Sequence, residues 1–219
     1  MYFLFHPVSS LNHLVARLLT DQITLVISIF LFVFIALSYR KPFWQRLDKS
    51  IHEWAFYAEE SKLKKLSADF AIFGNAIFHI LYSVLLCIVF FIIRHKISSV
   101  MSILFVLIFS WGLNRLMKLV FKRTRPGQQD SGVRKRLSYC FPSGHVMASI
   151  PIYFFSALSL QTLITFLPWY LIALIILFFV IMSRIYLNHH FFTDVLGGIC
   201  MGIFCLHVSI WFYFLVGLM

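Results

Sequence analysis

Long apolar runs alternate with short polar segments along the chain. A helix needs about 20 apolar residues to cross a bilayer, and six runs approach or reach that length: 22–39, 72–93, 98–120, 145–160, 163–182 and 194–218. Most charged residues lie between these runs, where water and headgroups can solvate them. The pattern predicts an all-α integral membrane bundle of six transmembrane helices, with residues 1–219 forming one domain.

Two segments outside the runs are predicted to lie at the membrane interface. Residues 1–20 are apolar and aromatic with a single charge, and they lack the basic start and small-residue cleavage site of a signal peptide. We expect an interfacial helix here. Residues 40–66 mix acids and bases with aromatic residues, as expected for one or two amphipathic helices among headgroups. Their charges are expected to form a solvated face rather than a binding site.

The composition excludes a soluble globular protein. Hydrophobic residues make up 61% of the 219 residues, charged residues 12%, and the mean hydropathy is +0.88, whereas soluble domains are about half apolar and a quarter charged. The four cysteines are scattered, and three lie within apolar runs. They show neither a disulfide framework nor metal-ligand spacing, so we expect small apolar core residues.

The net charge of +11 is large for a chain with so few ionisable groups. Nucleic acid is not an expected partner, because most of the predicted surface faces lipid. Anionic headgroups of the bilayer or a phosphorylated substrate account for the charge better.

Polar residues at the ends of the later runs are predicted to converge. Successive spans alternate in direction, so the end of the third run, the start of the fourth, the end of the fifth and the start of the sixth lie on one membrane side. Those ends carry Lys118, Arg125, Ser143, Gly144, His145, Ser183, Arg184, His190 and Asp194. We therefore expect one active site at one membrane face.

His190 and Asp194 form the chemical centre of this set. They are spaced i and i+4, so their side chains share a face if Asp194 opens a helix. A carboxylate that binds one imidazole nitrogen fixes the tautomer and frees the other nitrogen as a nucleophile or base. Arg184 adds a guanidinium suited to phosphate. Considered alone, the His–Asp pair is also compatible with an ordinary helix-surface contact.

Two upstream segments supply complementary groups. Lys118 and Arg125 are seven residues apart, which predicts a phosphate clamp on one helix face that ends at Pro126. The segment from Pro142 to His145 predicts a turn before a helix, where free N–H groups attract an anion. Its glycine admits close approach, its serine donates a hydroxyl and its histidine is placed to act as an acid. For the other bases nearby we expect only snorkelling toward headgroups: Lys122, Arg123, Arg134, Lys135 and Arg136.

Together these residues resemble the signature of a known family. The order Lys118-x6-Arg125-Pro126, then Pro142-Ser143-Gly144-His145, then Ser183-Arg184-x5-His190-x3-Asp194 resembles the three-part signature of the type 2 phosphatidic acid phosphatase superfamily. Every signature position matches, and the resemblance covers residues 118–194. That superfamily also contains glucose-6-phosphatase and the vanadium haloperoxidases, but the apolar spans argue against a haloperoxidase.

The resemblance implies metal-independent phosphoryl transfer without a cofactor. His190 would attack phosphorus and form a phosphohistidine, Asp194 would orient it, and His145 would protonate the departing oxygen and then activate water. The phosphate oxygens would be held by Lys118, Arg125, Ser143, Gly144 and Arg184.

The expected substrate is a lipid with a phosphorylated head group, because the site would open at the bilayer boundary. Undecaprenyl diphosphate is placed first, ahead of lipid A, phosphatidylglycerol phosphate and phosphatidate, because Arg115 lies one turn from Lys118 and would hold a second phosphate. Pairing of Arg115 with a neighbouring polar group is an equal alternative. Transfer to a lipid or sugar acceptor would use the same residues. A protein that only binds lipid phosphate would not need the full set of His145, His190 and Asp194.

The other histidines are not expected to act in catalysis. His189 is expected to support the site or face solvent. His79 and His207 lie within predicted spans and are expected to be satisfied core residues. No partner is predicted for the remaining four, His6, His13, His52 and His95.

Charge and family resemblance give opposite predictions for the membrane side. Most lysines and arginines lie on the site side, which the positive-inside rule places in the cytoplasm. Members of the resembled family usually place the site on the opposite face. Bases that bind phosphate are poor reporters of topology, so we follow the family. We expect a multi-pass protein of the inner (cytoplasmic) membrane with its site on the extracytoplasmic face.

Overall fold

The computed structural model describes residues 22–57, 61–94, 97–126, 139–165 and 167–217. Within these ranges the chain is all-α, with eight α-helices and one short 3₁₀-helix. They are α2 (Gln22–Ser38), α3 (Pro42–Tyr57), α4 (Lys62–Phe70), η1 (Ala71–Gly74), α5 (Ala76–Arg94), α6 (Ile97–Phe121), α7 (Gly144–Gln161), α8 (Trp169–Tyr186) and α9 (Phe192–Gly217). The predicted interfacial helix at 1–20 lies outside the described residues.

The chain is a multi-pass membrane protein. Four of the described helices, α5, α6, α8 and α9, are long and apolar enough to cross a membrane, and α2 with α3 forms a fifth candidate bent by 94°. Side chains along the outer face of α5, such as Ile77, Leu81 and Leu85, are exposed and follow an i, i+4 pattern. Such a stripe would be unfavourable in water and is suited to lipid.

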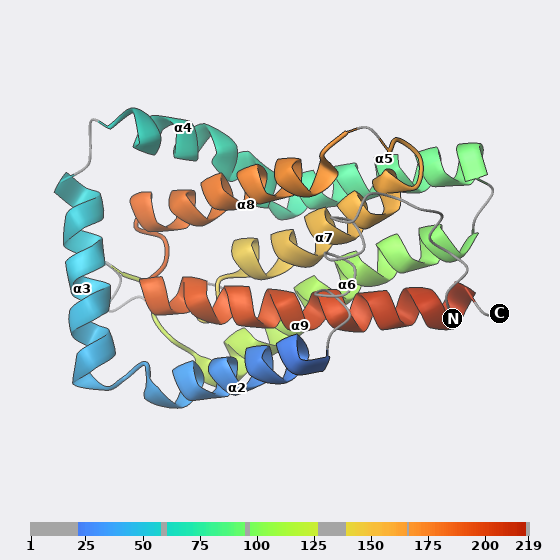
Figure 1. Cartoon of the computed structure of the whole chain (residues 1–219). Helices are drawn as coiled ribbons and strands as arrows, with labels where there is room; N and C mark the ends of the chain where they lie inside the picture. The colour runs from blue at the N-terminus through green and yellow to red at the C-terminus, as the bar shows by residue number, and fades with distance from the viewer. Residues whose placement is uncertain (1–21, 58–60, 95–96, 127–138, 166, 218–219) are drawn as a thin grey trace.

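Helix α7 occupies the centre of the bundle. It packs on α5, α6, α8 and α9, while α2 packs on α9 (Figure 1). Because 13 of its 18 residues are buried, α7 contacts other helices more than its surroundings. A helix in this position contacts little lipid and does not need a fully apolar surface. Helix α7 is therefore less apolar than the candidate spans, although it forms where the sequence predicts a helix.

Helix α3 lies across one end of the bundle, nearly perpendicular to the long helices (Figure 1). It follows α2 after a sharp bend and contacts both α8 and α9. One or two amphipathic helices are predicted between residues 40 and 66, and the structure has two, α3 and α4, of which α4 continues to Phe70. Helix α3 therefore covers the bundle end at which α8 finishes and α9 begins.

Three predicted helix boundaries are wrong, each for a local reason. Helix α6 matches the predicted run 98–120 but does not continue to Pro126 as the predicted clamp requires, because Lys122 adopts a left-handed backbone with φ of 48°. Helix α8 begins only at Trp169, after Pro168, which suits the start of a helix. Helix α5 begins at Ala76, because the preceding four residues form η1 and the next residue is extended.

Candidate active site

The described part of the site is assembled at the bundle end covered by α3. The backbone N–H of Ser143, just before α7, donates to the carbonyl of Asp194 in the first turn of α9 (2.9 Å). The N–H of Cys140 donates to the carbonyl of Arg123, which joins the segment before α7 to the segment after α6 (2.9 Å). These bonds bring together the starts of α7 and α9 and the segment after α6, as the alternation of the runs predicts.

Asp194 faces His190 as the i, i+4 spacing predicts. Asp194 is the third residue of α9, and its Oδ2 accepts a hydrogen bond from the N–H of Phe191, the residue before the helix (2.9 Å). This contact is one half of a capping box and fixes the carboxylate. His190 Nδ1 lies 3.5 Å from the same oxygen, which is long for a hydrogen bond. Such contacts in catalytic pairs often tighten when substrate binds.

Burial keeps the imidazole of His190 uncharged. The residue is 4% exposed, and its burial lowers its pKa to about 4. Asp194 opposes this shift, while the charges of Arg125 and Lys118 reinforce it. At neutral pH the ring is therefore neutral, which is the form that can attack an electrophile with its second nitrogen.

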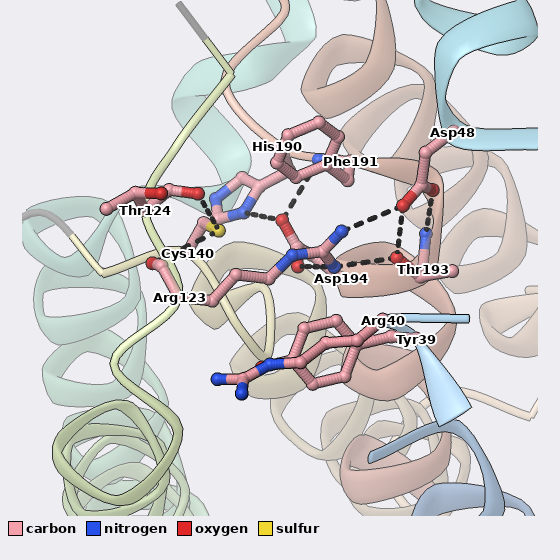
Figure 2. A network of polar contacts seen from close by, with 10 residues as sticks. All are labelled: Tyr39, Arg40, Asp48, Arg123, Thr124, Cys140, His190, Phe191, Thr193 and Asp194. Carbon is pink, nitrogen blue, oxygen red and sulfur yellow. Dashed lines mark hydrogen bonds and ion pairs between the residues drawn. The ribbon is translucent and has the colours of Figure 1, made fainter. Parts of the chain in front are cut away.

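Arg123 is a site residue for which the sequence predicted only snorkelling, and that prediction is wrong. Its Nη1 donates to Asp194 Oδ1 (2.6 Å) and its Nη2 to Asp48 Oδ2 (2.8 Å), as Figure 2 shows. The guanidinium lies between two aromatic rings, 4.6 Å from the centroid of Tyr39 and 4.3 Å from that of Phe191. Burial acts to lower the pKa of Arg123, but the two carboxylates outweigh it and raise the pKa above its ordinary value.

The turn before α7 has the geometry of an anion site. Ser143 occupies the N-cap position, and its Oγ is buried without a hydrogen-bond partner among the described residues. At Gly144 a Cβ would lie 2.6 Å from Asn114 Oδ1, so any larger residue would displace the Asn114 side chain. Asn114 in turn donates from Nδ2 to the carbonyl of Pro142 (3.2 Å). A free hydroxyl at a helix N-terminus is suited to hold a phosphate oxygen.

His145 is held by a residue that the sequence did not single out. Asn75, between η1 and α5, places its Oδ1 2.9 Å from His145 Nε2. An amide oxygen only accepts, so this contact puts a proton on Nε2. A Cβ at Gly74 would lie 3.0 Å from the ring of His145, so the end of η1 packs directly on the imidazole. The sequence around Asn75 does not indicate that it binds His145, because the two residues are 70 positions apart.

The predicted cations surround the two histidines. Lys118 lies in the last turn of α6, and Arg184 is buried in α8 with its Nε donating to Ser183 Oγ (3.0 Å). The charges of Lys118 and Arg184 both act on His145, and those of Lys118 and Arg125 act on His190. The predicted helical clamp is nevertheless wrong, because α6 ends four residues before Arg125. Arg125 reaches the same neighbourhood from the irregular segment after α6.

Arg115 is placed differently from the other candidates. It is exposed, and its neighbours Leu116 and Leu119 on α6 are exposed as well. Its side chain thus shares the outer face of α6 with lipid-facing residues, which favours snorkelling toward headgroups. A role toward a second phosphate stays a prediction without support from this position.

Three other histidines, His79, His189 and His207, lie in supporting or structural positions. Burial and the nearby arginines lower the pKa of His189, which lies beside His190 outside the helices. His79 hydrogen-bonds Ser149 (3.2 Å) and His207 Nδ1 approaches the carbonyl of Ile203 (2.8 Å), and both side chains are buried in the bundle. Both therefore lie in the core as expected, with at least one ring nitrogen of each hydrogen-bonded.

The arrangement is suited to chemistry on a tetrahedral anion. A neutral imidazole backed by a carboxylate lies near a second imidazole, with a buried hydroxyl and several cations in the same neighbourhood. Within the described ranges no cluster of three or more His, Cys, Asp or Glu side chains is arranged to hold a metal ion.

Comparison with known proteins gives three findings. A family model described as PAP2 superfamily matches residues 99–217, more than half of the chain. Phosphatidylglycerophosphatase B of Bacillus subtilis (strain 168) is 38% identical over 96 residues, and the match covers 42% of this chain and less than half, 46%, of that relative. A crystal structure described as the first transmembrane PAP2 type phosphatidylglycerolphosphate phosphatase from Bacillus subtilis matches with a TM-score of 0.76 and 26% identity. That match covers 86% of this chain and 95% of that chain.

Proposed function

The chain belongs to the PAP2 superfamily, and from this membership we propose that it is a metal-independent membrane lipid phosphatase that works through a phosphohistidine. The observation that carries the proposal is the buried pair of His190 and Asp194, whose neutral imidazole lies near the cations Lys118 and Arg125. Attack on phosphorus requires such a neutral nucleophile, a carboxylate that orients it and cations that stabilise the phosphate charge.

In the first step, Nε2 of His190 attacks phosphorus and the bond from phosphorus to the lipid oxygen breaks. Asp194 stabilises the positive charge that develops on His190, since its carboxylate faces Nδ1. His145 in its protonated form gives a proton to the leaving oxygen, and the negative charge of the bound phosphate favours that form. The Oδ1 of Asn75 accepts a hydrogen bond from the Nε2 proton of His145, so Nδ1 of His145 is left for proton transfer.

In the second step, water attacks the phosphohistidine. His145, now neutral, accepts the proton of that water, and the phosphorus–nitrogen bond breaks to release inorganic phosphate and neutral His190. Charge builds on the equatorial oxygens in both steps. It is stabilised by Lys118, Arg125, Ser143, Gly144 and Arg184.

Phosphatidylglycerol phosphate is the substrate that we place first. Both named relatives are phosphatases of that lipid by their descriptions. The preference for undecaprenyl diphosphate depended on Arg115, and the exposed position of that residue beside Leu116 and Leu119 removes the structural argument for it. Undecaprenyl diphosphate, lipid A and phosphatidate are the alternatives, as is transfer of the phosphoryl group to an acceptor.

We propose six membrane crossings, formed by α2, α5, α6, α7, α8 and α9. Helix α2 has 17 residues and a length of about 26 Å, which approaches the roughly 30 Å of a hydrocarbon core. Helix α7 has nearly the same length and is shielded from lipid by its neighbours. Six crossings place the end of α6, the start of α7, the end of α8 and the start of α9 on one side.

That side is proposed to be the extracytoplasmic face of the inner membrane. Labelling of spheroplasts with an impermeant thiol reagent decides it, using a cysteine at Lys49, an exposed residue of α3, and one at Thr162, an exposed residue after the far end of α7. Reaction at position 49 and protection at position 162 are expected. The reverse pattern would place the site in the cytoplasm.

The function is tested by phosphate release from the four candidate lipids with purified protein and its variants. His190→Asn is expected to lower kcat by at least about 1,000-fold, because it removes the nucleophile. His189→Asn is the matched control and should retain most activity, since the proposal gives it no part in the chemistry. A chelator should leave the wild type unaffected. Persistent turnover in His190→Asn, or loss of activity with the chelator, would contradict the proposal.

A further inference from the structure

Asp48 of α3 is a buried charge that the proposed mechanism does not use. Its residue is 3% exposed, although α3 is otherwise an amphipathic surface helix with exposed charges such as Lys49 and Glu53. The sequence predicts a solvated face for this segment, and Asp48 departs from that prediction. Buried carboxylates are retained only with strong partners, so its partners show what it does.

Asp48 binds the residue next to Asp194. Its Oδ1 accepts from the backbone N–H of Thr193 (2.9 Å) and its Oδ2 accepts from the hydroxyl of Thr193 (2.7 Å). That N–H belongs to the first turn of α9, where the helix itself supplies no acceptor. Asp48 therefore caps α9 from a different helix, one residue before the catalytic carboxylate.

Asp48 also shares Arg123 with Asp194. Arg123 Nη2 donates to Asp48 Oδ2 (2.8 Å), while Nη1 donates to Asp194 Oδ1 (2.6 Å) and to Thr193 Oγ1 (2.7 Å), as the dashed lines in Figure 2 show. One guanidinium thus lies between two carboxylates. Without Asp48, the positive charge of Arg123 would act on Asp194 alone and weaken the support that this carboxylate gives to a cationic His190.

We propose that Asp48 is a positioning residue for catalysis: through Arg123 and Thr193 it sets both the orientation of Asp194 and the negative charge available to His190. The inference depends on the proposed function, because it assigns Asp48 to the same His190 chemistry. It also extends the site beyond the matched region, since Asp48 precedes residues 99–217. The interfacial helix becomes part of the active site.

The alternative is that Asp48 only ties α3 to the bundle. A structural tie would lower thermal stability and reduce the amount of active protein. A positioning role would lower the rate of phosphoryl transfer in protein that is fully folded. The two roles are distinguished by whether a variant changes kcat or KM, and by whether a carboxylate on a longer side chain restores the activity.

The test compares Asp48→Asn and Asp48→Glu with the wild type in lipid phosphate hydrolysis. Asp48→Asn removes the charge and presents an amide donor or a less basic oxygen to Arg123. We expect kcat to fall about 10- to 100-fold, the range typical of residues that orient a catalytic group, with KM within about twofold of the wild type. Asp48→Glu should recover a large part of the lost kcat because it restores the charge.

The control is Glu53→Gln, which removes the same charge from an exposed position of the same helix, where Glu53 pairs with Lys49 at 3.8 Å. It should behave as the wild type. Thr193→Val is a second variant, since it retains the backbone contact to Asp48 and removes only the hydroxyl. A fall in kcat of about three- to tenfold is expected, because the hydroxyl loses two hydrogen bonds, the one it donates to Asp48 Oδ2 and the one it accepts from Arg123 Nη1.

Two outcomes would overturn the inference. One is Asp48→Asn with kcat within about twofold of the wild type. The other is a loss in Asp48→Asn that follows the fraction of unfolded protein and is not recovered by Asp48→Glu, which would leave a structural tie only. Failure of the proposed function would look different, because turnover would then survive in His190→Asn whatever residue 48 is.

Discussion

Three groups compete for the two oxygens of Asp194. Arg123 and the N–H of Phe191 hold it at 2.6 and 2.9 Å, whereas His190 lies at 3.5 Å. The carboxylate is thus fixed by its cap and its arginine before it meets the histidine. A carboxylate that is already oriented needs little reorganisation when charge develops on the imidazole, which is the condition for efficient electrostatic stabilisation.

His190 is predicted to titrate well below an ordinary histidine. Burial lowers its pKa to about 4, below the ordinary value of 6.5, so the ring should stay neutral as the pH falls from 7 to 5. Because protonation removes the nucleophile, the reactive form should be lost only near pH 4. NMR of ¹⁵N-histidine protein, with the signal assigned by its absence in His190→Asn, measures this directly. A midpoint near 6.5 would contradict the expected burial effect.

The sequence predicts the proposed catalytic residues better than it predicts the residues that position them through long-range contacts. His190 and Asp194 lie only four positions apart, so the short turn of chain that leads into α9 is enough to bring them together. Arg123 binds carboxylates 71 and 75 positions away in the chain. Nothing in the adjacent sequence distinguishes it from Lys122, the base beside it. Long-range partners of this kind depend on how helices pack, which periodicity does not contain.

At the scale of elements, close contact between α7 and α9 sets the anion site. Gly198 of α9 faces the turn before α7, and a Cβ there would lie 2.9 Å from the carbonyl oxygen of Ser143 and 3.2 Å from Val146. Small residues at helix interfaces permit such approach within membranes. The position of the Ser143 hydroxyl therefore depends on the absence of a side chain on the neighbouring helix.

Gly198→Ala should damage catalysis because the clash is with backbone. Displacement of the turn by a fraction of an ångström moves Ser143 and Gly144 away from the phosphate, and we expect kcat/KM to fall about 100-fold. Gly112→Ala is the control, since nothing lies within 4 Å of a Cβ at that position of α6. It should retain activity and gain up to about 1 kcal/mol in helix stability. Equal activity of the two variants in lipid phosphate hydrolysis would contradict this packing argument.

Helix boundaries show where local pattern stops being sufficient. The apolar runs locate α2, α6, α7 and α9 closely, because apolar length is a strong signal for helices in lipid. The end of α6 at Phe121 and the break at Asn75 follow from the left-handed backbone of Lys122 and the extended backbone of Asn75, which apolar length does not encode. Both interruptions serve the site, one by releasing Arg123 from the helix and the other by placing an amide on His145.

At the scale of the whole molecule, the bundle separates two tasks. The outer helices present apolar side chains to lipid, and the central α7 carries the anion-binding turn at the end that α3 covers (Figure 1). Cation, carboxylate and imidazole therefore meet at one end of the bundle, and we propose that the lipid tail of a substrate lies beside the helices. Such a division suits an enzyme that acts on a head group without removing the lipid from the bilayer.

The central claim, attack by His190 on phosphorus, is tested most directly by trapping the phosphorylated enzyme. His145→Ala should accumulate it from an aryl phosphate, whose leaving group needs no proton, because the later attack by water lacks its base. After rapid quenching and digestion at alkaline pH, mass spectrometry is expected to place an acid-labile phosphate on the peptide containing His190, and none in the His145→Ala, His190→Asn double variant. Phosphate release at the normal rate without any such adduct, or an adduct on another residue, would contradict the account.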